Sequence, residues 1–236
     1  GYEEYGKEIL KKLRGMFAFA VWDFRDQSMF LGRDPFGIKP LFYQVTPGER
    51  LVFASEIKAI LSVPGEAREL NEQALASYLA FQYNPLEETF YRGIYQLLPG
   101  HSAMWKGGRL QIEEYWDMVW KPDKSKSEAE LVKQTALSLK DSVKSHMIGD
   151  VEIGTFLSGG IDSSVVAALS KVKKAFSVGF EEEGYSEIEK AAELCKRYGI
   201  THYTKKITRE EFWDSTGEIL DHLDEPVADP SIIPLN

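Results

Sequence analysis

The strongest chemical signal in this 236-residue sequence is a short glycine- and serine-rich segment, residues 158–164 (SGGIDSS). Two successive glycines remove side chains, so backbone N–H groups can approach an anion closely. A helix expected to begin near Ile161 would add the positive end of its dipole, and the serine hydroxyls would add further donors. Asp162 alone would repel a phosphate, so its carboxylate indicates a Mg²⁺ ligand that bridges to phosphate oxygens. The segment therefore predicts a pyrophosphate-binding loop.

The setting of the loop supports this interpretation. No lysine follows the glycines, so the loop is not the GxxxxGK[ST] motif, and kinase-like handling of a γ-phosphate is not indicated. The loop lies where a predicted strand passes to a predicted helix, which is the end of the strand where open α/β sheets bind ligands. A turn without a ligand is the plain alternative, and the strand–turn–helix context argues against it.

The second half of the sequence alternates between strand and helix patterns. Strands are predicted at 151–157, 175–180 and 203–207, and helices at 128–148, 161–171, 186–199 and 209–223. Ser186 and Glu189 have the spacing of a capping box, and Gly199 is a helix stop. This alternation implies right-handed βαβ units and a parallel sheet.

The first half is typical of a β-rich domain. Aromatic and β-branched runs at 16–22, 29–31, 41–43 and 51–53 predict hairpins in an all-β or layered sheet. Helices are expected at 56–61 and 71–81, the second with Asn71 as its N-cap, and strand-like sequence returns at 93–116. The charged segment 121–127 predicts a linker, so we expect domains at 1–120 and 121–236.

Composition limits the class of function. The net charge of −9, without a dense Lys/Arg stripe, argues against a nucleic-acid partner. The longest apolar run, 16–22, is too short to span a bilayer, and the first residues do not form a signal peptide, so cytoplasm is the expected location. The single cysteine, Cys195, excludes an internal disulfide and is expected to be buried in a helix. The histidines show no metal-ligand spacing: His101, His146, His202 and His222.

The loop resembles the SGGxDS motif of the PP-loop ATP pyrophosphatase superfamily, which cleaves ATP between the α and β phosphates to adenylate a substrate. This resemblance implies ATP and Mg²⁺ as cofactors. It also implies that a set of loop residues holds pyrophosphate, with Asp162 on the Mg²⁺: Ser158, Gly159, Gly160, Asp162 and Ser163. Phe156 and the segment Val178-Gly179 match positions that contact the nucleotide. From the residues alone, Phe156 and Val178 are core strand residues, and backbone contacts would satisfy both interpretations.

Segments of the first half resemble the later part of a class II glutamine amidotransferase domain: 13–20 (LRGMFAFA), 32–41 (GRDPFGIKPL) and 53–58 (FASEIK). Residues 98–101 (LPGH) and 115–116 (YW) continue the match into a connector. Together with the loop, they make essentially the whole chain resemble glutamine-hydrolysing asparagine synthetases. The implied fold is part of an Ntn-hydrolase-type layered β-sheet domain followed by a parallel-sheet, adenine nucleotide α-hydrolase-like PP-loop domain.

The reaction implied by the resemblance is ATP-dependent amidation of aspartate with glutamine as nitrogen donor, through β-aspartyl-AMP and with release of pyrophosphate. The implied partners are these small molecules, and a homodimer is left open. Residues 224–226 and 229–231 resemble the stretch that leads to the family's substrate pocket, with Asp229 and Ser231 as candidates for the aspartate pocket. A loop in which Pro226 stops the helix is the equal alternative.

The catalytic groups of the family are expected outside this sequence. The N-terminal cysteine, whose α-amine serves as base, is expected before Gly1. A second SGEGxDE-like Mg²⁺/pyrophosphate motif and a late basic residue are expected after Asn236. The sequence is therefore expected to be a fragment with no catalytic residue of its own and no glutaminase activity.

Several weaker features have alternative interpretations. Arg33 and Asp34 are expected to form a structural ion pair at a glycine turn, and Glu56 and Lys58 to make interdomain or ammonia-path contacts. The alternatives for the whole protein are a related synthetase acting on another carboxylate, of a β-lactam-forming or peptide-amidating type, or an inactive module that only binds nucleotide.

Overall fold

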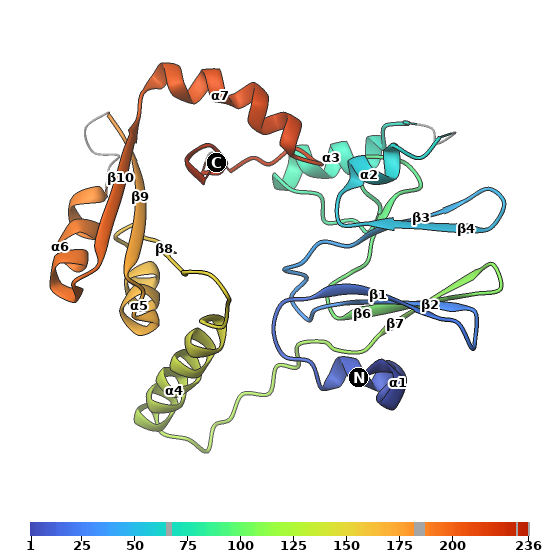
Figure 1. Cartoon of the computed structure of the whole chain (residues 1–236), viewed down its shortest axis with the longest axis horizontal. Coiled ribbons are helices and arrows are strands. Elements are labelled where there is room, and N and C mark those ends of the chain that lie inside the picture. Colours follow the sequence, from blue (N-terminus) through green and yellow to red (C-terminus); the bar gives the residue numbers. More distant parts are fainter. Residues whose placement is uncertain (65–67, 182–186, 230, 236) are drawn as a thin grey trace. The chain divides into compact units, whose positions relative to one another are not determined.

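The computed structural model describes residues 1–64, 68–181, 187–229 and 231–235 (Figure 1). They form two compact units. The first comprises Gly1–Trp120 with Leu223–Ala228, and the second comprises Lys121–His222 with Asp229–Asn236. The second unit begins at Lys121, inside the segment interpreted as a linker. The predicted domains, 1–120 and 121–236, place Leu223–Ala228 in the second domain, whereas in the structure this segment belongs to the first unit.

The first unit contains two antiparallel sheets, which Figure 1 shows as two layers. One has the order β1-β2-β6-β7, and the other has the order β4-β3-β5. The strands of the first sheet are β1 (Ala18–Asp23), β2 (Ser28–Arg33), β6 (His101–Lys106) and β7 (Arg109–Glu114). Those of the second are β3 (Phe42–Thr46), β4 (Arg50–Ala54) and β5 (Tyr95–Gln96). Buried side chains from both sheets share one cluster, which includes Leu31, Tyr43 and Ala103. This confirms the layered sheet.

The helices of the first unit are short. They are α1 (Tyr2–Tyr5), the 3₁₀ helix η1 (Gly6–Lys11), α2 (Ile57–Leu61) and α3 (Glu72–Phe81). The predicted cap of α3 is confirmed, because the Asn71 side chain accepts the N–H groups of Gln73 and Ala74 at 3.1 and 3.3 Å. Ile57 and Ile60 of α2 are fully buried with Ile94, so α2 is held by its apolar face.

Arg33 and Asp34 are both buried, but among the described residues their side chains do not form the expected direct ion pair with each other. Each charge is satisfied by backbone: the Arg33 guanidinium donates to the carbonyls of Lys39, Gly37 and Leu97. The Asp34 carboxylate accepts four backbone N–H groups, those of Phe17, Phe36, Ile38 and Lys39. Burial acts to raise the pKa of Asp34, but these four donors outweigh it and leave that pKa below its ordinary value.

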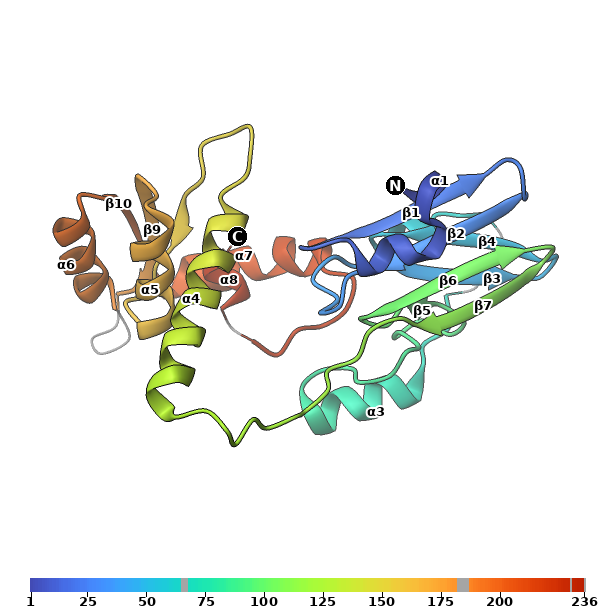
Figure 2. The ribbon, with the colours of Figure 1, turned by 90° about the horizontal axis from the view of Figure 1, so that it is seen from below.

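The second unit is built around a three-stranded parallel sheet in the order β10-β9-β8, which confirms the predicted parallel pairing. In chain order its elements are α4 (Glu128–His146), β8 (Thr155–Phe156), α5 (Ile161–Ser170), β9 (Lys174–Phe180), α6 (Ile188–Tyr198), β10 (Thr201–Ile207), α7 (Arg209–His222) and α8 (Ile232–Leu235). Figures 1 and 2 show α4 beside α5, and the two helices are in contact.

The strand predicted at 151–157 is much shorter in the structure. Only Thr155 and Phe156 pair with β9, and Val151 is 79% exposed. The apolar pattern overestimated this strand because its length depends on the neighbour it pairs with, which local sequence does not contain.

The core of the second unit lies between the sheet and the helices α5 and α6. It includes Leu157, Ala167, Ala175, Ala191 and Cys195. Cys195 is buried as predicted, and burial raises the pKa of its thiol. Gly199 ends α6 with φ +66°, which confirms the predicted stop. The capping box predicted from Ser186 lies outside the described residues, and Glu187 is the N-cap of α6 without a side-chain capping bond.

None of the helices in the described ranges is both long and apolar enough to cross a membrane.

Candidate functional site

The SGGIDSS loop connects β8 to α5 at the carboxyl end of the parallel strand, where such sheets bind ligands. Gly159 has φ +78°, a conformation that favours glycine. A Cβ added to Gly159 would lie 3.0 Å from the carbonyl oxygen of Glu187 and 3.0 Å from Cβ of Lys190. Gly160 is the N-cap of α5 with φ −72°, and a Cβ there would meet only the Ser158 hydroxyl, at 3.4 Å. Gly159 is therefore required by its positive φ and by its close neighbours. At Gly160 a side chain would fit, and its absence leaves open space at the start of α5.

The serines of the loop bind one another. The Ser163 hydroxyl accepts the N–H of Ser158 at 3.3 Å, lies 3.0 Å from the Ser158 hydroxyl, and donates to the Gly160 carbonyl at 3.2 Å. The Ser158 hydroxyl also accepts the N–H of Gly160 at 3.4 Å. These bonds curl the backbone around Gly159, and both hydroxyls can turn toward an anion placed over the helix start.

Asp162 is exposed in the first turn of α5. The described residues contain no group of three or more His, Cys, Asp or Glu side chains that could hold a metal ion. A single carboxylate beside serine hydroxyls still fits Mg²⁺, which binds proteins through one or two carboxylates and takes its other ligands from phosphates and water.

The strand residues that were predicted to contact the nucleotide lie near the carboxyl ends of β8 and β9, at the end of the sheet where the loop begins. Phe156 pairs with Phe176, two residues before Val178. Val178 is half-buried and Gly179 is buried. The interpretation of Phe156 as a core residue is wrong, because its side chain is 61% exposed.

Phe156 belongs to a row of rings that crosses the three strands on the face opposite α5 and α6. Its ring centroid lies 6.5 Å from that of Phe176, which stacks on Tyr203 at 5.2 Å. The sequence pattern marked these positions as apolar, but it did not indicate which face of the sheet the helices cover.

Two residues next to the loop were missed in the sequence. Ser177 is 6% exposed, and its hydroxyl donates to the carbonyl of Leu157, the residue before the loop. Nε2 of His202 lies 2.7 Å from the same hydroxyl. The signal that could have revealed Ser177 is its position on the buried face of an alternating strand, since a buried hydroxyl needs a hydrogen-bond partner.

Asp229 and Ser231 are both exposed and bonded to each other locally. The Asp229 carboxylate accepts the N–H of Ser231 at 2.9 Å, which lowers the pKa of Asp229. Their part in an aspartate pocket stays a prediction.

The neighbouring acidic pair belongs to the first unit. The Asp224 carboxylate accepts the N–H of Lys58 at 3.1 Å, and the Glu225 carboxylate accepts the N–H of Phe90 at 2.8 Å. Burial raises the pKa of Glu225 despite the Phe90 donor. Through these contacts, the two carboxylates fasten the segment Leu223–Ala228 to the rest of the first unit.

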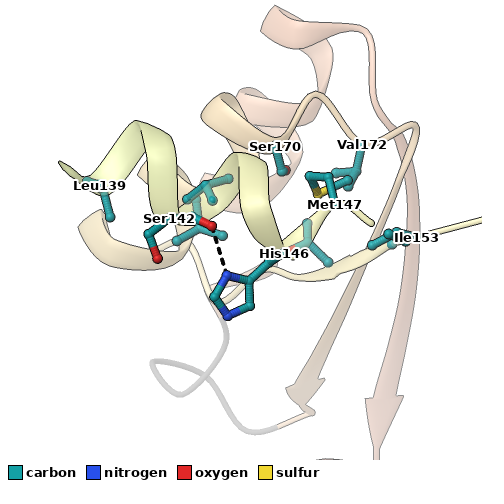
Figure 3. A pocket seen from close by; sticks show the side chains of 11 residues that line it. Leu139, Ser142, His146, Met147, Ile153, Ser170 and Val172 are labelled. Carbon is teal, nitrogen blue, oxygen red and sulfur yellow. Dashed lines mark hydrogen bonds between the residues drawn. The ribbon is translucent and has the colours of Figure 1, made fainter. Parts of the chain in front are cut away.

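A cavity of about 320 Å³ lies between α4, α5 and β8 (Figure 3). Leu139, Met147, Ile153 and Val172 supply apolar walls, and Nδ1 of His146 lies 2.8 Å from the Ser142 carbonyl. The β8 and α5 residues of its wall come from the start of β8 and the later part of α5, which is the end of both elements away from the loop. The cavity is therefore separate from the candidate site.

Comparison with known proteins identifies two families along the chain. Residues 1–116 match the family described as glutamine amidotransferase domain, and residues 134–236 match the family described as asparagine synthase. The class of protein is therefore one in which these two domains are joined in a single chain.

Among curated relatives, asparagine synthetase [glutamine-hydrolyzing] 1 of Bacillus subtilis (strain 168) is 39% identical over 239 residues, covering 99% of this chain and 37% of the relative. A putative asparagine synthetase [glutamine-hydrolyzing] of Mycobacterium tuberculosis (strain ATCC 25618 / H37Rv) is 40% identical over 246 residues, covering 100% and 38%. Amidase chyE of Penicillium rubens is 31% identical over 256 residues, covering 97% and 37%.

These matches confirm the resemblance to glutamine-hydrolysing asparagine synthetases over essentially the whole chain. The chain spans 37% of the length of the Bacillus relative and 38% of the Mycobacterium relative.

Proposed function

We propose that the protein containing this chain is an ATP-dependent ligase that converts aspartate to asparagine with glutamine as nitrogen donor. The β-carboxylate of aspartate attacks the α-phosphorus of ATP, and the bond to the β-phosphate oxygen breaks to release pyrophosphate. Ammonia from glutamine hydrolysis then attacks the acyl carbon of β-aspartyl-AMP, and AMP leaves. The observation that carries this proposal is the SGGIDSS loop, which opens α5 at the carboxyl end of a parallel strand in a chain 39% and 40% identical to named asparagine synthetases.

The residues of the loop have separate tasks in this proposal. Backbone N–H groups at Gly159 and Gly160, with the start of α5, bind the pyrophosphate part of ATP and stabilise it as it leaves. The hydroxyls of Ser158 and Ser163 donate to phosphate oxygens once they turn away from each other. Asp162 would hold Mg²⁺, which neutralises charge on the phosphates when bound.

The remaining proposed contacts lie around the loop. Phe156, Val178 and Gly179 contact the nucleotide through the backbone of β8 and β9, and Asp229 and Ser231 belong to the aspartate pocket. Glutamine hydrolysis is assigned to the amidotransferase domain, of which residues 1–116 form part, in an Ntn-hydrolase-type layer of sheets.

The test is a product analysis with the full-length protein. Aspartate, glutamine, ATP and Mg²⁺ should give asparagine, glutamate, AMP and pyrophosphate in equal amounts. Leaving out aspartate should abolish AMP formation, and ammonium chloride should replace glutamine. Production of ADP and orthophosphate instead would contradict the proposal.

A second candidate is a synthetase of the same architecture that acts on a different carboxylate. The relative named amidase chyE favours it, because it matches 97% of the chain under a different name. The two candidates differ in one measurement. If a panel of other carboxylates supports AMP formation while aspartate does not, the second candidate holds; if nucleotide binds but none of them supports it, the module only binds nucleotide.

A further inference from the structure

Two side chains behind the loop form a hydrogen-bonded chain that ends on the backbone just before it. The Ser177 hydroxyl on β9 donates to the Leu157 carbonyl, and Nε2 of His202 on β10 lies 2.7 Å from that hydroxyl. A hydroxyl has a single proton, and here the Leu157 carbonyl receives it. His202 must therefore be the donor to Ser177, so its Nε2 carries a proton.

This chain lies where the pairing of β8 with β9 stops. The last pair is Phe156 with Phe176, followed by one bond from the Leu157 N–H to the Phe176 carbonyl at 2.9 Å. The next bond of a regular parallel ladder would join the Val178 N–H to the Leu157 carbonyl. That bond is not formed within the described residues. Instead, the Leu157 carbonyl accepts a hydrogen bond from the Ser177 hydroxyl.

The missing ladder bond has a consequence for Val178. Residues two apart on a parallel strand direct their backbone groups toward the same neighbour. Since the Phe176 carbonyl is bonded to Leu157, the Val178 N–H faces the side where β8 has already left the sheet. It therefore points toward the space beside the loop. If the Leu157 carbonyl instead accepted the Val178 N–H, β8 would lengthen by one residue pair. The Val178 N–H would then be bonded within the sheet and could not bind a ligand.

We propose that Ser177 and His202 are positioning residues for a nucleoside triphosphate bound at the loop. By holding the Leu157 carbonyl, they keep the Val178 N–H available to the nucleotide and set the direction in which Ser158 leaves the sheet. They act through the backbone of Leu157 and Val178. This inference rests on the proposed ATP chemistry of the same loop.

The experiment uses the full-length protein and measures both the affinity for ATP by calorimetry and the KM values for ATP and glutamine. Ser177→Ala removes the donor to Leu157, and His202→Leu removes the donor to Ser177. His202→Gln keeps an N–H group near the position of Nε2. Ser170→Ala and His146→Gln are matched controls. In the part of the chain that the structure describes, both side chains bond only to carbonyls of their own helices, at Ala167 and Ser142.

We expect Ser177→Ala and His202→Leu to weaken ATP binding and to raise KM for ATP about 2- to 10-fold, the value of one lost hydrogen bond. The KM for glutamine should not change, His202→Gln should stay close to wild type, and both controls should match wild type. Should Ser177→Ala fail to fold, the two His202 variants decide, since that side chain is only half-buried.

Two results would overturn the inference. One is unchanged affinity for ATP in both Ser177→Ala and His202→Leu. The other is a general loss, in which the thermal midpoint falls, the KM for glutamine rises as well and His202→Gln gives no rescue. A wild-type protein that binds ATP but forms no AMP would refute the proposed function alone, because ATP affinity would still test the positioning role.

Discussion

The hydroxyl groups of Ser158 and Ser163 lie 3.0 Å apart across the SGGIDSS loop, so each is a hydrogen-bond partner of the other. The Ser163 hydroxyl also joins the N–H of Ser158 to the carbonyl of Gly160. The loop thus holds its curled shape through its own side chains. In the proposed binding mode, a phosphate oxygen that accepts one of these hydroxyls would meet a backbone already arranged around Gly159, which would reduce the entropy cost of binding.

Gly159→Ala should destabilise the second unit by about 1–3 kcal/mol, because alanine is strained at φ +78°. Its Cβ would also press on the Glu187 carbonyl and the Lys190 side chain, each at 3.0 Å. Urea unfolding followed by circular dichroism measures the change. Gly160→Ala is the matched control: its φ of −72° suits alanine, so unfolding should shift by less than about 0.5 kcal/mol. Equal stability of the two variants would contradict the assignment.

Asp162→Asn should weaken Mg²⁺-dependent ATP binding about 10- to 100-fold while leaving the fold intact, because the amide removes the negative charge that Mg²⁺ requires. Calorimetric titration of ATP with and without Mg²⁺ measures this. Without Mg²⁺, the variant should bind ATP at least as well as wild type, since a repulsive charge is gone. Asp214→Asn, at an exposed position of α7, is the control. Equal losses with and without Mg²⁺ would refute the metal role.

Glu225 should make the docking of Leu223–Ala228 dependent on pH. Burial raises the pKa of Glu225 in the folded state above its ordinary value, so the folded state binds the proton more tightly. The contribution of Glu225 to the free energy of unfolding is therefore fully present at pH values below the ordinary glutamate pKa. It falls as pH rises through the raised pKa, and then levels off.

Glu225→Gln tests this dependence, because its side-chain carbonyl can still accept the Phe90 N–H without a charge. We expect the variant to gain stability over wild type at pH above the raised pKa and to differ little below it. Urea unfolding of both proteins across a pH series measures the difference. Glu69→Gln, at an exposed position of the first unit, should follow the wild-type curve. A constant difference at all pH values would contradict the prediction.

Asp34→Asn should destabilise the first unit by about 2–4 kcal/mol, because an amide nitrogen cannot accept the two N–H groups that one carboxylate oxygen now takes from Phe17 and Lys39. Thermal and urea unfolding measure the loss. Asp26→Asn, where the carboxylate is exposed and pairs with Lys106 at 3.4 Å, should change stability by less than about 0.5 kcal/mol. Similar effects of the two changes would show that the backbone contacts of Asp34 carry little weight.

Much of the fold follows from features that are local in the chain. Asn71 caps α3 through N–H groups two and three residues away, and Gly199 ends α6 by its own backbone conformation. The serines and glycines that shape the loop lie within residues 158–164. Such contacts depend on neighbours a few residues apart, so the sequence alone determines them, and with them the place of the loop between a strand and a helix.

Other features were decided only by the tertiary structure, since they join parts of the chain that sequence order separates. The length of β8, the exposure of Phe156 and the bond between Ser177 and His202 depend on which strands pair and in which register. The attachment of Glu225 to Phe90 joins residues 135 positions apart. The sequence by itself therefore determined which residues form the loop, and the folded sheet decided what holds it.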